Sequence, residues 1–155
     1  MNILNFFTKA LSTFFYVGYL PLVPGTFGSF AAIVLFYLIK SSIVLHIFFT
    51  ALILILGFLV TGRAERLFNR KDPSCIVIDE VAGMLLSLLF IPYDIKLVII
   101  AFIIFRIFDT LKPYPADCLQ KLRGSLGIMS DDIIAGLYTN IILQVVWRVA
   151  ILKAS

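Results

Sequence analysis

Charged residues, histidine and cysteine are all scarce in this chain. Only 14% of its 155 residues are charged, and it has one histidine and two cysteines. A single histidine excludes a site built on a pair of histidines, and Cys75 and Cys118 lack the spacing of a zinc site or a CxxC pair. We expect both cysteines to be reduced and without a chemical role. We expect His46 to be a packed or hydrogen-bonded core residue.

Apolar residues are abundant instead. They make up 61% of the chain, and the mean hydropathy is +1.06, whereas a soluble domain has about 45–50% apolar residues. The chain is therefore predicted to be an integral membrane protein with one domain over residues 1–155. Its formal charge of +4 does not indicate nucleic-acid binding, because the basic residues lie in short loops and form no stripe. The N-terminus does not resemble a signal peptide.

The pattern of apolar runs and breakers predicts an all-α fold, a polytopic membrane helical bundle with about four to five membrane helices plus an N-terminal interfacial helix. Residues 43–60 form the cleanest spanning segment, because about 18 residues approach the length that a hydrocarbon core of about 30 Å requires. The other predicted helices are 3–20 (interfacial), Phe27 to about Ile39, 76–91, 95–108 and 131–152. Residues 61–73 and 110–130 are predicted to be polar connections.

Lysine and arginine are concentrated in those two connections. They are Arg63, Arg66, Arg70 and Lys71 in the first, and Lys112, Lys121 and Arg123 in the second. Short cytoplasmic loops carry such an excess, so both connections are predicted to face the cytoplasm. Counting helices up and down then places the Gly25-Thr26 turn, Asp79-Glu80, Asp109 and Asp131-Asp132 all at the cytoplasmic face.

Five of the nine acids border apolar segments: Asp79, Glu80, Asp109, Asp131 and Asp132. An ionised acid at a helix centre costs roughly +2.5 to +3.5 kcal/mol on insertion scales, and acids in such places usually serve metal, proton or substrate chemistry. Two of the predicted apolar helices each begin with a pair of adjacent acids, Asp79-Glu80 in one and Asp131-Asp132 in the other. The helix dipole favours one exposed acid there by about 0.3–1 kcal/mol, which does not account for two.

Asp109 ends its helix, where the dipole disfavours an acid. Arg106 and Lys112 each lie three residues away, so a local ion pair is one interpretation. The other is that Asp109 binds a metal and the basic residues bind phosphate. The turn from Gly25, with Thr26, Gly28 and Ser29, could likewise bind phosphate at a helix N-terminus. Alternatively, it is a helix entry capped by Thr26.

Four stretches occur in a specific order from about residue 10 to residue 145. They are Pro24-Gly25-Thr26 with Gly28-Ser29; Ile76 to Val81 with Gly83; Phe105-Arg106 with Phe108-Asp109, Lys112-Pro113 and Pro115; and Gly127 to Met129 with Asp131-Asp132 and Ala135-Gly136. Together they resemble the signatures of the phosphatidylglycerophosphatase A family. The resemblance implies a magnesium-dependent phosphatase of the bacterial inner membrane, which converts phosphatidylglycerophosphate to phosphatidylglycerol. Ala82 and Thr110 depart from the pattern at apolar positions only.

The motifs that are absent from the sequence argue against two common classes of phosphatase mechanism. The chain has no Asp-x-Asp motif and no Cys-x5-Arg loop, which leaves a carboxylate cluster of the kind that suits Mg²⁺. We expect the five acids to hold one or two Mg²⁺ ions and to activate a water, with one acid as the base. Lys112, Arg106 and the turn with Thr26, Gly28 and Ser29 would neutralise the phosphate. The role of each acid and the oligomeric state stay open.

Two other classes of membrane protein use clustered acids. A CDP-alcohol phosphatidyltransferase would need an Asp-Gly-x2-Ala-Arg motif, which this chain lacks. A cation or proton transporter would place its carboxylates near the bilayer midplane, whereas here the predicted topology gathers them at the cytoplasmic face.

Overall fold

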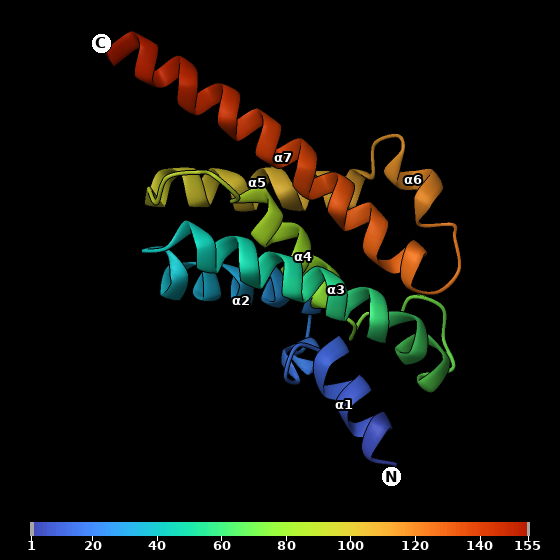
Figure 1. The fold of residues 1–155 in the computed structure, drawn as a ribbon. Helices are drawn as coiled ribbons and strands as arrows, with labels where there is room; N and C mark the ends of the chain where they lie inside the picture. The colour runs from blue at the N-terminus through green and yellow to red at the C-terminus, as the bar shows by residue number, and fades with distance from the viewer. Residues whose placement is uncertain (1, 155) are drawn as a thin grey trace.

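The computed structural model describes residues 2–154, and this part of the chain is all-α (Figure 1). The all-α prediction is therefore confirmed. The elements are α1 Ile3–Ser12, η1 (a 3-10 turn) Val17–Tyr19, α2 Pro24–Ile39, α3 Ile43–Leu67, α4 Ile78–Ser87, α5 Ile95–Leu111, α6 Ala116–Leu119 and α7 Ser125–Ala154.

Two of the described helices are long and apolar enough to cross a membrane, namely α3 and the segment Ser125–Val149 of α7. The 25 residues of α3 correspond to about 37 Å, more than a hydrocarbon core of about 30 Å. Exposed apolar side chains on α3, such as Phe48 and Leu59, suit contact with lipid. The other described helices have at most 17 residues, so a count of four to five membrane helices remains a prediction.

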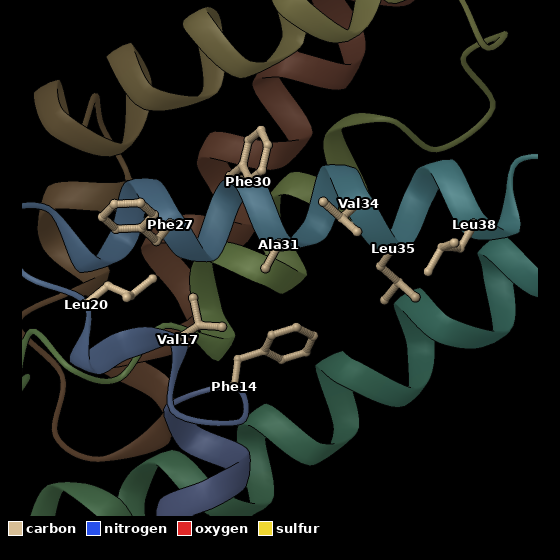
Figure 2. Close-up of a pocket in the computed structure, with 9 residues that line it drawn as sticks. All are labelled: Phe14, Val17, Leu20, Phe27, Phe30, Ala31, Val34, Leu35 and Leu38. Carbon is tan, nitrogen blue, oxygen red and sulfur yellow. The ribbon is translucent and has the colours of Figure 1, made fainter.

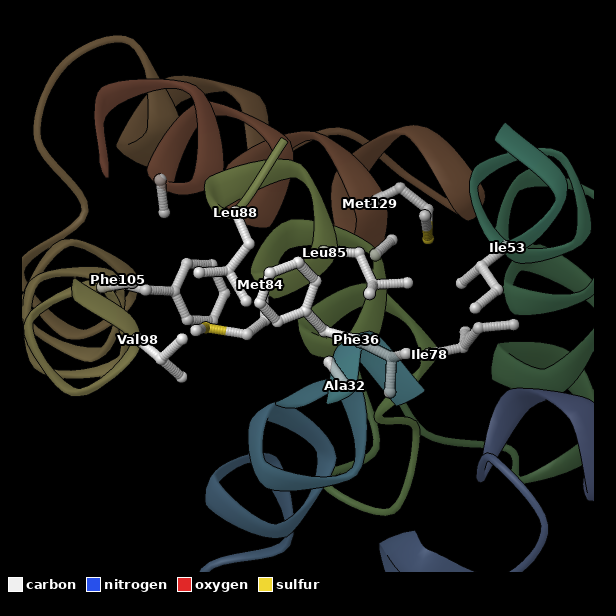
Figure 3. Close-up of a cluster of buried hydrophobic side chains, with 14 of the residues drawn as sticks. Ala32, Phe36, Ile53, Ile78, Met84, Leu85, Leu88, Val98, Phe105 and Met129 are labelled. Carbon is white, nitrogen blue, oxygen red and sulfur yellow. The ribbon is translucent and has the colours of Figure 1, made fainter. Parts of the chain in front are cut away.

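The short helix α4 lies at the centre of the bundle. It packs against α2 and α3 and against α5 and α7, and it runs between these two pairs (Figure 1). Met84 and Leu85 of α4 contribute to a buried apolar cluster that also contains Phe36, Phe105 and Met129 (Figure 3). Eight of its ten residues are buried, so its position is set by packing on nearly every side.

Because α4 ends inside the bundle, its last carbonyl groups need partners that water cannot supply. Asn140 of α7 donates from Nδ2 to the carbonyl oxygens of Ser87 at 3.1 Å and Leu89 at 2.7 Å. His46 Nε2 lies 3.0 Å from the carbonyl oxygen of Leu85, and since a carbonyl only accepts, Nε2 is the donor. The prediction that His46 is a hydrogen-bonded core residue is confirmed.

The N-terminal segment differs from the predicted helix over residues 3–20. The helix α1 ends at Ser12, and Phe14, Phe15 and Tyr16 then adopt φ angles of 43°, 54° and 70°. Three successive left-handed residues cannot continue a right-handed helix. The turn is fastened to the connection before α4, where Val77 donates its N–H to the carbonyl oxygen of Ser12 at 3.0 Å.

Two helix starts also differ from prediction. Pro24 occupies the first position of α2 and Val23 makes no side-chain cap, so Thr26 lies within the first turn and is not the cap. The helix α7 begins at Ser125, within the predicted connection 110–130, which also contains α6. The start of α7 is anchored to α3, because Gly62 donates its N–H to Ser125 Oγ at 3.0 Å.

Candidate active site

All five acids singled out in the sequence line one pocket of about 310 Å³. Asp79 and Glu80 come from the first turn of α4, Asp109 from the last turn of α5, and Asp131 and Asp132 from the second turn of α7. The pocket lies where the N-terminus of α2 meets these three helices. Folding thus brings together carboxylates from three helices that are separated in sequence by connections and whole helices.

The acids of α7 reach the pocket differently from expectation. Asp131 and Asp132 do not open their helix, because α7 starts six residues earlier at Ser125. They are nevertheless buried, with exposed fractions of 6% and 3%. Burial of two adjacent carboxylates within a helix is less favourable than placement at its N-terminus, which strengthens the case for a chemical role.

Three carboxylates of the pocket lie close to one another. Oxygen atoms of Asp79, Glu80 and Asp132 lie within 4.8 Å of one another. Asp79 Oδ1 and Glu80 Oε2 are buried and have no hydrogen-bond partner, which is costly for a carboxylate unless a cation is present. Neither histidine nor cysteine is among the described residues that line the pocket. An all-oxygen donor set of this kind fits Mg²⁺.

Burial also changes the acidity of the α4 carboxyls, which belong to a helix too short to span a membrane. Burial raises the pKa of Asp79 well above its ordinary value, and the nearby charges of Glu80 and Asp132 add to this shift. Burial raises the pKa of Glu80 to about 7, with a further contribution from the charge of Asp109. Positive charge in the pocket would therefore favour the ionised form of both carboxyls.

Two basic side chains face the acids. Arg106 Nη1 lies 2.6 Å from Asp109 Oδ2, one helical turn along α5. Lys112 does not pair with Asp109 but donates from Nζ to Asp131 Oδ2 across the pocket. Burial lowers the pKa of Lys112, but the hydrogen bond and charge of Asp131 outweigh this effect, so its pKa is raised. The ammonium group is therefore charged at neutral pH.

The turn at the start of α2 contributes less than the sequence suggested. Gly25 lines the pocket, but Thr26, Gly28 and Ser29 do not. Ser29 donates from Oγ to the carbonyl oxygen of Gly25 at 3.0 Å. Gly28 allows α2 to approach α4, because a Cβ there would lie 2.9 Å from Val77 Cβ. In this geometry the glycine serves helix packing.

Two further polar residues line the pocket, Asp72 and Ser74 in the connection before α4. Neither was selected from the sequence, because both lie in a polar loop where such residues are ordinary. The proximity of Asp72 to the Asp79-Glu80 pair along the chain was the available signal. With Asp72 included, six acids and two basic residues line the pocket.

One family profile and two relatives carry the same name. The profile of the family described as Phosphatidylglycerophosphatase A (PgpA) matches residues 10–147. Phosphatidylglycerophosphatase A of Haemophilus influenzae is 36% identical over 124 residues, which are 77% of this chain and 76% of that protein. Phosphatidylglycerophosphatase A of Escherichia coli K12 is 35% identical over 142 residues, which are 88% of this chain and 83% of that protein.

A third relative carries a different name. A protein of Bacteroides thetaiotaomicron with the provisional name phosphatidylinositol-3-phosphatase is 33% identical over 150 residues, which are 91% of this chain and 94% of that protein. No solved structure gives a significant match. The family profile and the relatives each cover most of the chain, and the chain belongs to the phosphatidylglycerophosphatase A family of phosphatases.

Proposed function

We propose that this protein is a magnesium-dependent phosphatase that hydrolyses phosphatidylglycerophosphate to phosphatidylglycerol and phosphate in the pocket between α2, α4, α5 and α7. One observation carries the proposal, the cluster of Asp79, Glu80 and Asp132 in the same pocket as two basic side chains, in which Asp79 and Glu80 each have a buried carboxylate oxygen without a hydrogen-bond partner. The substrate is inferred from the family and from the names of two relatives.

The balance of charge in the pocket supports the requirement for a cation. The six acids outnumber Arg106 and Lys112, and a phosphate monoester brings further negative charge. Without added positive charge, the substrate would be repelled by the very groups that line its site. Asp79, Glu80 and Asp132 would hold Mg²⁺, which when bound supplies the charge that polarises the phosphate and makes water more acidic.

The side chains that line the pocket would then divide phosphate binding, positioning and proton transfer among them. Arg106 and Lys112 would bind the equatorial phosphate oxygens, Arg106 with a planar pair of donors. Asp109 and Asp131 hold these cations at the pocket through the ion pairs described above. The water oxygen forms a bond to phosphorus as the bond from phosphorus to the glycerol oxygen breaks. One carboxylate accepts the proton of the water, and the glycerol oxygen gains a proton to become a hydroxyl.

The location follows from the same geometry and from the distribution of charge. With α3 and α7 spanning a bacterial inner membrane and the basic connections in the cytoplasm, the pocket opens at the cytoplasmic face. A lipid whose phosphate lies at that surface can reach the pocket without leaving the bilayer. This placement disfavours a transporter, which needs a site reached from both sides in turn.

The direct test is release of inorganic phosphate by the purified full chain, with Mg²⁺ and with EDTA. Phosphatidylglycerophosphate, phosphatidic acid and phosphatidylinositol 3-phosphate should be compared at equal concentration, because one relative is named for the last of these. We expect the highest kcat/KM with phosphatidylglycerophosphate and no release in EDTA. Preference for another of the three lipids would contradict the substrate assignment.

A further inference from the structure

A hollow lined only by apolar side chains runs along α2 beside the polar pocket. It has a volume of about 420 Å³ and lies between α2 and the turn that follows α1 (Figure 2). Leu20 and Phe27 lie at the end near the N-terminus of α2, and Leu38 lies at the other end. Ala31 lies on the helix between them, facing Phe14 (Figure 2). We call this hollow the α2 groove.

The α2 groove and the polar pocket share a short stretch of chain. Leu20 and Phe27 line the groove, whereas Leu22 and Val23, between them in sequence, line the polar pocket. Phe27 donates its N–H to the carbonyl oxygen of Val23 at 3.3 Å, so one helical turn separates the two linings. A molecule with a polar end and an apolar end can therefore occupy both hollows at once.

The length of the groove corresponds to one leaflet of a bilayer. From Phe27 to Leu38 the helix rises about 16 Å, close to half of a hydrocarbon core of about 30 Å. The groove begins at the polar pocket and runs away from it along α2. This is the direction that an acyl chain takes when its phosphate lies at the membrane surface.

We propose that the α2 groove binds one acyl chain of the substrate lipid while its terminal phosphate occupies the polar pocket. This inference rests on the proposed function. The outer wall is open, because Phe30, Val34 and Leu38 are 57%, 46% and 72% exposed, so a chain enters sideways from the bilayer. Bulk lipid can touch the same surface, but a chain tethered to a phosphate in the pocket is held there specifically.

The proposal is tested by filling the groove and varying the length of the acyl chain. Ala31→Phe places a ring in the middle of the groove. Ala51→Phe is the matched control, because Ala51 is an exposed residue of α3 that does not line the groove. The values of kcat/KM are measured in one detergent with dioleoyl and dihexanoyl phosphatidylglycerophosphate. Val34→Trp provides a second variant at the exposed edge of the groove, where no buried neighbour must move.

We expect Ala31→Phe and Val34→Trp to lower kcat/KM for the dioleoyl lipid about ten-fold and for the dihexanoyl lipid less than about two-fold. Ala51→Phe should leave both values unchanged. If the ratio of the two substrates stays that of the parent in both groove variants, the groove holds only bulk lipid and the inference is wrong. If instead the parent releases no phosphate from either lipid, the proposed function fails, and this inference fails with it.

Discussion

Gly83 of α4 and Gly136 of α7 lie directly against each other where the two helices cross. A Cβ at Gly136 would lie 2.5 Å from the carbonyl oxygen of Gly83, and a Cβ at Gly83 would lie 2.6 Å from that of Asp132. Asp79 and Asp132 are each four residues before one of these glycines, so both lie one turn away on the same side. The close crossing therefore brings the two carboxylates together.

Substitution of Gly136 by alanine should separate the helices and weaken the metal site. The backbone of α4 cannot yield easily, so we expect a loss of stability of about 1–3 kcal/mol and a higher Mg²⁺ concentration for half-maximal activity. Thermal unfolding and a magnesium titration measure the two effects. Leu137→Ala, which removes an exposed side chain of α7, is the control and should change neither. Parent-like magnesium dependence in Gly136→Ala would contradict this role.

Removal of divalent metal should abolish activity. The possible metal ligands among the described residues of the pocket are carboxylate oxygens, so Mg²⁺ or Mn²⁺ should restore turnover after treatment with EDTA. Ca²⁺ should restore it poorly, because Ca²⁺ prefers a larger and less regular coordination shell. Phosphate release in metal-free buffer is the measurement. Full turnover in that buffer would rule out the proposed chemistry while leaving the fold assignment intact.

Substitution of Asp79, Asp109 or Asp132 by asparagine should reduce kcat/KM about 100-fold or more, because each change removes charge at nearly constant volume. The matched control is Asp94→Asn. Asp94 caps α5 by accepting the N–H of Lys96 at 2.7 Å, and asparagine caps a helix equally well. The protein yield should stay close to the parent in all four variants. An equally damaging Asp94→Asn would place the site elsewhere.

The sequence predicted which acids gather in one place better than it predicted how the helices arrange them. The five acids could be selected because an acid at the border of an apolar segment has few structural explanations, and all five line the pocket. The partner of Lys112 could not be inferred, because Asp131 is nineteen residues away and reaches it only through the packing of α7. The early start of α7 was missed for a similar reason, since Ser125 is stabilised by Gly62 of another helix.

The turn at the start of α2 was given more residues of a phosphate site than the pocket contains. A glycine-rich entry to a helix is typical both of phosphate sites and of close helix packing, and local sequence cannot separate the two. In the structure, a Cβ at Gly28 would lie 2.9 Å from the Cβ of Val77, the residue before α4, and the hydroxyl of Ser29 donates a hydrogen bond within its own helix. Phosphate binding by Thr26, Gly28 and Ser29 stays a prediction, and the geometry points to Gly25 as the residue of this turn that borders the pocket.

Substitution of Lys112 by alanine should raise KM and lower kcat, because it removes a cation whose interaction with phosphate strengthens in the transition state. It also leaves Asp131 without its partner. Lys121→Ala is the matched control, since the side chain of Lys121 is 70% exposed and lies 3.7 Å from the half-exposed Asp117, away from the pocket lining. Steady-state kinetics on both variants decide the matter. Unchanged kinetics in Lys112→Ala would leave Arg106 as the basic residue that binds phosphate.

Protons should compete with Mg²⁺ for the pocket, because a carboxyl must ionise before it binds a cation. The pKa of Glu80 is raised from 4.5 to about 7, so half-maximal activity should need more Mg²⁺ at about pH 6 than at about pH 8. Saturating Mg²⁺ should recover most of the activity lost at the lower pH. A magnesium requirement that does not change with pH would contradict this coupling.

As the pH rises, the stability of the metal-free protein should fall while its affinity for Mg²⁺ increases. A buried carboxyl with a raised pKa is neutral at low pH and becomes a buried charge as the pH rises, so the protein without metal should lose stability between about pH 4.5 and pH 7. Mg²⁺ binds the ionised form and should remove most of this loss. Thermal unfolding in EDTA and in Mg²⁺ measures the difference. Glu80→Gln cannot ionise at this position, and it should reduce the pH dependence in EDTA over this range, even though it impairs catalysis; a pH dependence equal to that of the parent would contradict the contribution of Glu80.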